Sequence, residues 1–417
     1  MTGPHRLLLA LLRRDTRRDS MPAFPPDTWS ELPTVAPRDL HPYLAWRLPH
    51  LVDAAGIPAG VVESLDLARR GAVVGHLPRQ ALLRRIAGAL DGAGVPFVVL
   101  KGAALAHLAW PDPTLRPMGD IDIWTRPESM DQASAALIAA GIPYSSRMEL
   151  RRAAANPLET ATVRVFEAPG TQVVLELHGT VRSMAATAPA WLELAWARAT
   201  PRDLGGVTAL VPHAEDMLTH LAVHASVQHQ FAMGFRPLLD IALWLEREGG
   251  SCDWPALGDR WRREGCLTWG SLPLALAREL LAAPVPPGFL EPAGLPPEFA
   301  ELQELALAQV FGAERTLPPT LAKLATTPTA GGRGRWLLHR LTRWYWEGPP
   351  GIRRRPLEVL RGAAGRMSSD LRTKLPAYLR GWRDGSLRGE EFQRRQALAA
   401  GRERLLELVR RVEPPRQ

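Results

Sequence analysis

Residues 116–125 read RPMGDIDIWT, and this stretch decides the fold because acidic and apolar residues alternate in it directly after a glycine. Alternation with a period of two is typical of a β-strand whose two faces meet different surroundings. Asp120 and Asp122 should therefore project from one face, while Ile121 and Ile123 anchor the other face in the core. Aspartate is uncommon in strands, and two adjacent carboxylates repel each other. The pattern predicts either a bound divalent cation or a solvated edge strand.

The sequence around this strand predicts a small α/β unit between about residues 75 and 185. An amphipathic helical pattern ends at two glycines, and a short apolar run follows that is typical of a buried strand. A further helical pattern and two alternating runs joined by Ala168-Pro169-Gly170 come after the acidic strand. The predicted elements are, in order, a helix at 79–92, a strand at 95–100, a short helix from 101, a strand at 120–124, a helix at 127–140 and a β-hairpin at 160–181.

Four regions follow from this pattern. They are an N-terminal lead-in with helices (1–74), the α/β core (75–200), a helical substrate-side domain (201–290), and a Pro-rich connection with a basic helical C-terminal region (291–417). Residues 1–36, rich in Pro and Arg, are expected to be a loosely held lead-in. Two separate helices are expected here, one around residues 60–74 and one that begins near residue 79 and stops at Gly92 and Gly94. The fold class is α+β.

Composition favours a cytoplasmic protein without a transmembrane segment. Of 417 residues, 46% are hydrophobic and 23% are charged, and no apolar run approaches the roughly 18 residues that a membrane-spanning helix needs. The apolar run LLLALL near the start is too short for a signal peptide. Cys252 and Cys266 lack CxxC spacing, which predicts reduced thiols rather than a disulfide framework.

The positive charge of the chain is concentrated at its C-terminal end. The whole chain carries +8, but residues 331–417 hold 21 Lys and Arg against 9 Asp and Glu. Trp336, Trp344 and Tyr345 are interleaved with arginines in this region. Such a segment can bind an anionic membrane surface or nucleic acid, or it can be an amphipathic helix packed on the body with its arginines extended to solvent.

Residues on either side of the acidic strand are suited to phosphate. Lys101-Gly102 lies at a strand-to-helix turn, where backbone N–H groups can approach an anion. Lys101 and Arg116 can each meet a phosphate oxygen, with the arginine in bidentate geometry. In the sequence VVLELHGT (173–180), Glu176 and His178 share one strand face and add a third carboxylate. Together these residues predict a metal-dependent site that handles phosphate.

The order of these motifs resembles a known family. FVVLKGAALAHL, RPMGDIDIWT, VVLELHGTV and PHAEDMLTHLAVHA, between about residues 40 and 260, resemble the bacterial uncharacterised nucleotidyltransferases of the DNA polymerase β superfamily. The resemblance implies a small mixed β-sheet nucleotidyltransferase core flanked by helices, with a helical domain following. In that superfamily a Gly-Ser turn holds the nucleotide phosphates, and a pair of aspartates plus a third acid bind two metals. Here Lys101-Gly102-Ala103 stands at the turn, without the serine.

The resemblance also implies the reaction and the roles of the site residues. A nucleoside monophosphate, expected to be AMP, would pass from an NTP, expected to be ATP, to a hydroxyl or phosphate acceptor on a small molecule, glycan or peptide. Mg²⁺ (or Mn²⁺) would be the cofactor. The residues that would bind the metals and carry out catalysis are Asp120, Asp122 and Glu176, and those that would bind substrate are Lys101, Gly102, Arg116 and His178.

Other interpretations stay open at the level of the sequence. A phosphotransferase of cell-surface glycan modification would use the same clustered acids, and a non-catalytic nucleotide-binding or scaffold protein would keep the fold without the serine. His220, His224 and His229 have helical spacing, but Leu221 stands where a zinc protease would have glutamate. They are interpreted as packed or hydrogen-bonded residues near the cleft. Asp240, within an apolar stretch, is expected to pair with Arg236 or to line the cleft.

Overall fold

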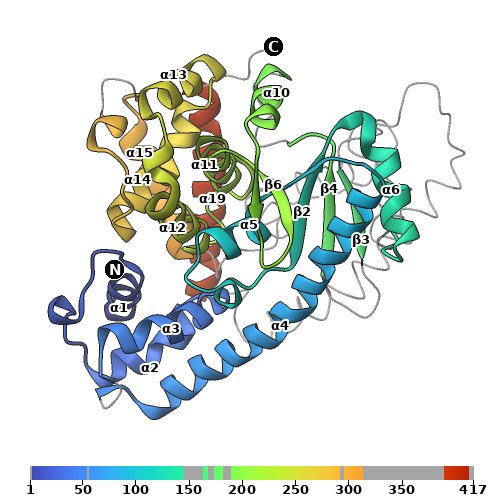
Figure 1. The fold of residues 1–417 in the computed structure, drawn as a ribbon. Coiled ribbons are helices and arrows are strands. Elements are labelled where there is room, and N and C mark those ends of the chain that lie inside the picture. The colour runs from blue at the N-terminus through green and yellow to red at the C-terminus, as the bar shows by residue number, and fades with distance from the viewer. Residues whose placement is uncertain are drawn as a thin grey trace, which may run out of the picture.

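A computed structural model describes residues 2–53, 56–144, 163–167, 173–181, 189–291, 295–312 and 389–412. Its centre is one six-stranded mixed sheet in the order β3-β4-β2-β1-β6-β5 (Figure 1). β2 runs parallel to β4 and β1 runs parallel to β6, while the other neighbours are antiparallel. The strands are β1 (Phe97–Val99), β2 (Asp120–Thr125), β3 (Val163–Glu167), β4 (Val174–His178), β5 (Thr200–Asp203) and β6 (Thr208–Val211). The predicted α+β class with a small mixed sheet is confirmed.

The sequence pattern found the first four strands but not the last two. β3 and β4 pair as the predicted hairpin, whose turn at 168–170 lies outside the described residues. β5 and β6 extend the sheet beyond β1, and Val98 is opposite Leu210 in the parallel pair. These two strands have only four residues each, and β5 contains a proline and two charged residues. Such short segments carry little periodic signal.

Strand β2 has two faces with different environments, as its alternation predicts. Ile121 and Ile123 are buried in the main hydrophobic core together with Leu175 and Leu177 of β4. The opposite face carries Asp120, Asp122 and, at its far end, Trp124. Trp124 packs edge-on against Trp196 of α10 (Pro189–Ala197) in a second, smaller apolar cluster. This face of β2 is therefore polar at the end that carries Asp120 and Asp122, and apolar at the other end, where α10 covers it.

The prediction that residues 1–36 form a loosely held lead-in is wrong. This segment folds into α1 (Gly3–Leu12) and α2 (Pro26–Val35), followed by α3 (His41–Leu51). The four leucines Leu7, Leu8, Leu11 and Leu12 are completely buried. They recur at helical spacing, so one face of α1 can enter the core although arginines and prolines surround it in the sequence.

The next segment forms one helix where the sequence predicted two. α4 (Ala59–Gly92) has 34 residues and continues through Pro78. Its C-terminal half places Leu83, Ile86 and Leu90 in the same core cluster as the isoleucines of β2. Figure 1 shows this long helix passing from the N-terminal helices towards the sheet. Two shorter helices accompany the sheet, α5 (Lys101–Leu108) and α6 (Met130–Ala139).

A helical region follows the sheet, as predicted. It consists of α11 (Ala214–Val223), the π-helical turn η6 (His224–Gln228), α12 (Arg236–Glu248), α13 (Trp254–Glu264), α14 (Leu267–Leu281) and α15 (Phe299–Gly312). Single 3-10 turns occur at η1 (Arg18–Ser20), η2 (Arg38–Leu40), η4 (Pro113–Leu115), η5 (Pro127–Ser129), η7 (Gly249–Ser251) and η8 (Pro287–Leu290). Among the described helices, none is both long enough and apolar enough to cross a bilayer.

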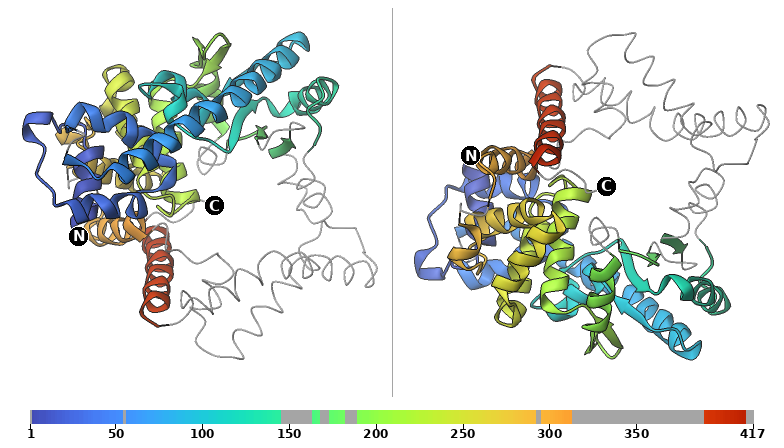
Figure 2. Two further views of the ribbon diagram at one scale, coloured as in Figure 1. Left: turned by 90° about the horizontal axis from the view of Figure 1, so that it is seen from below. Right: turned by 90° about the horizontal axis from the view of Figure 1, so that it is seen from above.

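The last described helix, α19 (Gly389–Val412), packs against α15 in both views of Figure 2. Leu405, Leu408 and Val409 on its inner face are completely buried. Exposed ion pairs to α15 and the segment before it, Arg404 with Glu301 and Arg411 with Glu298, flank this contact. This part of the basic C-terminal region is thus a packed element. The aromatic and basic segment at 335–347 lies outside the described residues.

Candidate active site

The turn between β1 and α5 brings Lys101 to the acidic strand. Lys101 has φ of +40°, a left-handed conformation that non-glycine residues adopt rarely and mostly where the surroundings enforce it. Its Nζ donates a hydrogen bond of 2.9 Å to Oδ1 of Asp122. The backbone N–H of Leu100 meets the carbonyl of Asp122 at 3.0 Å, which fixes the turn against β2. The strained turn and the acidic strand are therefore one unit.

Gly102 is required at this turn by a close approach. A Cβ added at this position would lie 2.6 Å from Nη1 of Arg116, well inside contact distance. The guanidinium group therefore occupies the space above the turn. The sequence argument expected glycine here so that backbone N–H groups could approach an anion, and the structure adds a packing reason of its own.

Asp122 is the buried centre of the site. Its Oδ1 accepts hydrogen bonds from Lys101 at 2.9 Å and from Nε2 of His178 at 3.0 Å. Burial by itself would raise the pKa of the Asp122 carboxyl, but the charge of Lys101 and the His178 hydrogen bond outweigh it and hold the pKa well below its usual range. Asp122 is consequently ionised, and its Oδ1 accepts the hydrogen bonds of Lys101 and His178.

Glu176 and His178 reach the same place from the neighbouring strand. Glu176 pairs directly with Asp122 in the parallel register of β2 and β4, so both side chains point to one face. His178 Nε2 lies 3.6 Å from Oε2 of Glu176. Asp122, Glu176 and His178 each offer one potential metal ligand, and these atoms all lie within 4.8 Å of one another. Burial and the Asp122 charge raise the pKa of Glu176.

Asp120 stands at the exposed start of β2, on the same face as Asp122 but outside this group of three. Partial burial and the charge of Asp122 raise its pKa. The structure thus brings together Asp122, Glu176, His178 and Lys101 tightly, with Asp120 at the rim. We call Asp120, Asp122, Glu176 and His178 the acidic site.

Arg116 occupies a different environment from the expected one. Its Nε and Nη2 donate to the two carboxylate oxygens of Asp240 at 2.8 and 2.7 Å, and Trp110 Nε1 donates to Asp240 Oδ1 at 2.8 Å. The bidentate fork that was expected to meet phosphate is therefore taken by Asp240, and Nη1 is the nitrogen that faces Gly102. The predicted pairing of Asp240 with Arg236 is wrong, because Arg236 pairs with Asp39 at 3.1 Å.

The sequence analysis missed this role of Asp240 because 124 residues separate it from Arg116. An acid within an apolar helix was the available signal, and it indicates a buried partner without naming one. The Arg116–Asp240 pair connects the loop before β2 to α12. It therefore fixes the position of the acidic strand relative to the helical region.

Three histidines lie on the helical side of the site. Nε2 of His224 and Nε2 of His229 are 3.2 Å apart, and His220 is buried beside them. Burial and the charge of Lys101 lower the pKa of all three, that of His229 to about 4. The burial of His220 and the hydrogen bond between His224 and His229 agree with the interpretation of these histidines as packed or hydrogen-bonded residues.

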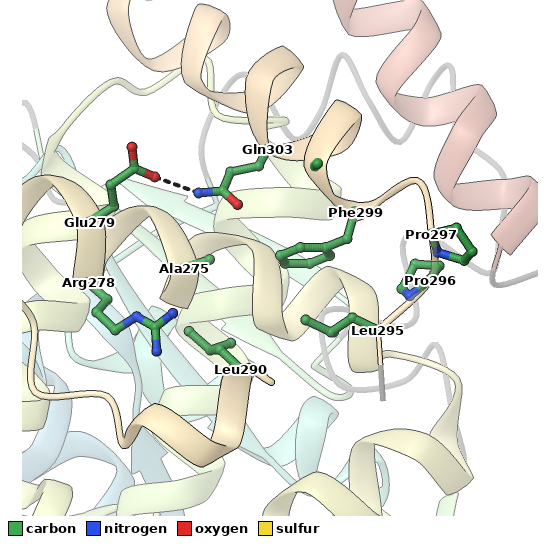
Figure 3. Close-up of a pocket in the computed structure, with 10 residues that line it drawn as sticks. Ala275, Arg278, Glu279, Leu290, Leu295, Pro296, Pro297, Phe299 and Gln303 are labelled. Atoms are coloured by element: carbon green, nitrogen blue, oxygen red, sulfur yellow. Dashed lines mark hydrogen bonds between the residues drawn. The ribbon is translucent and has the colours of Figure 1, made fainter. Parts of the chain in front are cut away.

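A large cavity lies elsewhere in the molecule, between α14, Leu290, residues 295–297 and α15 (Figure 3). It has a volume of about 710 Å³ and is lined mainly by apolar side chains, among them Leu290, Leu295 and Phe299. Glu279 at its edge bonds Gln303. No residue of the acidic site lines this cavity, so its size gives it no part in the chemistry described above.

The fold and the site together define the class of this protein. A mixed α+β sheet presents carboxylates from two neighbouring strands beside a lysine-glycine turn, an arrangement suited to a cation and to phosphate. The chain belongs to the family of uncharacterised nucleotidyltransferases, whose family model matches residues 25–282, more than half of its length. Nucleotidyl transfer is accordingly its class of reaction. No curated protein and no solved structure matches the chain.

Proposed function

We propose that this protein is a Mg²⁺-dependent nucleotidyltransferase of the DNA polymerase β superfamily that transfers AMP from ATP to a hydroxyl or phosphate acceptor. The observation that carries the proposal is the arrangement of Asp122 and Glu176 side by side on neighbouring strands, with Lys101 bonded to Asp122. Carboxylates for a cation and a lysine at a glycine turn for phosphate are what such a reaction requires. Because ATP is a cytoplasmic metabolite, the proposed reaction takes place in the cytoplasm.

The residues present fit a hard divalent cation. Asp120 and Glu176 have raised pKa values because they are partly buried and lie next to the Asp122 charge, so their ionised forms repel one another. A divalent cation relieves that repulsion, and carboxylate oxygens are the ligands that Mg²⁺ or Mn²⁺ prefers. Asp120, Asp122 and Glu176 would hold it. When bound, the cation would neutralise negative charge on the triphosphate and on the leaving pyrophosphate.

The residues of the chain would then position the reactants and move one proton. Lys101 holds a phosphate oxygen beside Asp122, and the backbone at Gly102 allows the phosphates to approach. The acceptor hydroxyl oxygen attacks the α-phosphorus, and its proton passes to the carboxylate of Glu176. The α–β phosphoanhydride bond breaks, pyrophosphate leaves, and AMP stays on the acceptor. As a carboxylate on the strand next to Asp122, Glu176 lies where it can accept this proton.

Arg116 acts through position in this proposal. Its fork is held by Asp240, and its Nη1 lies above Gly102. It therefore fixes the position of the Lys101-Gly102 turn, which is proposed to face the phosphates. At most one of its nitrogens is available to a phosphate oxygen. His178 holds the Asp122 carboxylate in place from β4.

The experiment is a comparison of the wild type with the double variant Asp120→Asn, Asp122→Asn. Calorimetric titration with Mg²⁺-ATP and release of labelled pyrophosphate with candidate acceptors are measured for both proteins. We expect the double variant to bind Mg²⁺-ATP at least tenfold more weakly and to lose transfer. Asp259→Asn is the matched control, since Asp259 is an exposed acid paired with Arg262.

Unchanged ATP binding and transfer in the double variant would show that the metal ligands are assigned wrongly. A donor screen with the four ribonucleoside triphosphates and a nucleotide-activated alcohol identifies the transferred group. Transfer of a phospho-alcohol instead of AMP would point to the glycan phosphotransferase reaction. Binding of Mg²⁺-ATP without turnover on any acceptor would point to a nucleotide-binding protein.

A further inference from the structure

The C-terminal helix α19 brings Arg402 to the histidine side of the active site. Nε of Arg402 donates a hydrogen bond to Oε1 of Gln230, the residue after His229. His229 is surrounded by cations, and after burial the charges of Lys101, Arg236 and Arg402 are what lower its pKa to about 4. The charges of Arg402 and Lys101 thus act on the same histidine, although the two residues are far apart in the sequence.

Within the described residues, Arg402 differs from the other cations of this region in having no acidic partner. Lys101 pairs with Asp122, Arg116 with Asp240 and Arg236 with Asp39. Arg404 and Arg411 on the same helix pair with Glu301 and Glu298. Among the residues that the structure describes, no carboxylate lies within ion-pair distance of Arg402. Burial therefore lowers its pKa with no acid to oppose it.

The hydrogen bond to Gln230 uses little of the binding capacity of Arg402. A guanidinium group has five N–H donors in a planar fork, and this bond engages the Nε. Gln230 and Phe231 both have left-handed φ values, +48° and +61°, so the bond helps to hold a strained turn in place. Within the part of the chain that the structure describes, neither terminal nitrogen has a hydrogen-bond partner. A half-buried, charged fork with two available nitrogens is what bidentate recognition of an oxyanion uses.

We propose that Arg402 binds an oxyanion of the acceptor, a phosphate or a carboxylate, so that the acceptor class is anionic. This inference rests on the proposed function, because it assigns the donor phosphates to Lys101 and Gly102. Those two residues lie within the region that the family model matches, 25–282, whereas α19 lies outside it. An arginine on a helix outside the matched region is suited to recognising the acceptor, which the family match does not specify.

The test uses the full chain saturated with Mg²⁺ and a non-hydrolysable ATP analogue. Inorganic phosphate and acetate are titrated separately by calorimetry into the wild type, Arg402→Gln and Arg402→Lys. We expect the wild type to bind one of the two anions, Arg402→Gln to bind it roughly tenfold more weakly or worse, and Arg402→Lys to recover part of the affinity. Arg404→Gln is the control on the same helix and should bind like the wild type. Preference for phosphate or for acetate identifies the anionic group.

Equal anion binding by the wild type and Arg402→Gln would overturn the inference, as would a wild type that binds neither anion. Loss of anion binding when the ATP analogue is added would show that the anion sits in the donor site. If the analogue itself does not bind, the proposed function fails, and titration of the anions alone still tests Arg402.

A second measurement needs no variant and so does not depend on folding of Arg402→Gln. Wild-type protein is treated with phenylglyoxal, and modification of each arginine is followed by mass spectrometry with and without the anion. We expect the anion to slow modification of Arg402 and to leave Arg404 unaffected. Equal rates for Arg402 in both conditions would contradict the proposal.

Discussion

At the scale of single residues, the side chains of the site shift one another's pKa values. Lys101 and His178 keep Asp122 ionised against the effect of burial, while the Asp122 charge makes ionisation of Asp120 and Glu176 harder. Burial, and after it the positive charge of Lys101, lower the pKa of the three neighbouring histidines. Lys101, in its left-handed conformation, thus affects the protonation of both the acidic site and these histidines.

His229 gives a prediction for stability against pH. Its folded pKa of about 4 lies below the value of roughly 6.5 for an unfolded histidine, so the unfolded chain binds the proton first as the pH falls. The contribution of His229 to stability is therefore present above pH 6.5 and is lost between pH 6.5 and 4. For this partly solvated group we expect a loss of about 1–2 kcal/mol across that window.

Urea unfolding of the wild type and of His229→Gln at several pH values measures this effect. The difference in unfolding free energy between the two proteins should shrink by that amount as the pH falls from 6.5 to 4.5. His50→Gln, at an exposed position, is the control and should run parallel to the wild type. Parallel curves for His229→Gln and the wild type would count against a depressed histidine pKa.

At the scale of secondary-structure elements, two buried carboxylates connect helices that are far apart in the sequence. Asp240 on α12 binds Arg116 and Trp110 next to β2. Asp216 on α11 is completely buried and accepts hydrogen bonds from Arg198, after α10, and from Arg260 of α13 at 2.7 and 2.8 Å. The two acids have similar surroundings, but only the first holds the loop that leads into the acidic strand.

Asp240→Asn and Asp216→Asn form a matched pair of variants. Asp240→Asn leaves the buried Arg116 without its ion-pair partner, so we expect it to lower the free energy of unfolding by roughly 3–5 kcal/mol. Asp216→Asn leaves Glu215 beside both Arg198 and Arg260, so we expect a smaller loss of about 1.5–3 kcal/mol. Asp240→Asn should in addition weaken Mg²⁺-ATP binding, because Arg116 would no longer be fixed above Gly102. Denaturant unfolding and calorimetry separate the two effects. If Asp216→Asn weakened ATP binding as much as Asp240→Asn, the loss would come from general destabilisation.

At the scale of the whole molecule, the first and the last described helices, α1 and α19, are packed parts of the body. α1 buries four leucines, and α19 buries Leu405, Leu408 and Val409 against α15. The described arginines of this docked helix have different environments: Arg404 and Arg411 pair with acids of α15 and the segment before it, whereas the half-buried Arg402 bonds Gln230. This helix is therefore part of the packed body and not a separate basic segment.

Leu408→Ala tests the docking of α19. Truncating a fully buried leucine removes apolar burial and leaves a cavity, so we expect a loss of about 2–5 kcal/mol in the free energy of unfolding. Arg404→Ala, which removes an exposed ion pair on the same helix, should cost about 0–1 kcal/mol. Urea unfolding followed by circular dichroism measures both. A Leu408→Ala protein as stable as the wild type would show that α19 contributes no binding energy to the body.

The sequence by itself determined the acidic strand, its neighbours and the shared face of Asp120 and Asp122. It could do so because the period of a strand fixes side-chain direction locally, over two residues. The glycines and the apolar runs likewise marked β1, β2 and the hairpin of β3 and β4. Each of these signals is complete within about ten residues, and so no tertiary contact was needed to read it.

The tertiary structure alone decided which partners these residues take. Asp240 joins Arg116 rather than Arg236, His178 meets Asp122, and Arg402 reaches Gln230 across 172 residues of sequence. The choice among several available acids and arginines depends on how helices and strands pack, and no local period encodes that packing. The same reason explains the two short strands that complete the sheet and the burial of α1, because both are stabilised by contacts with distant parts of the chain.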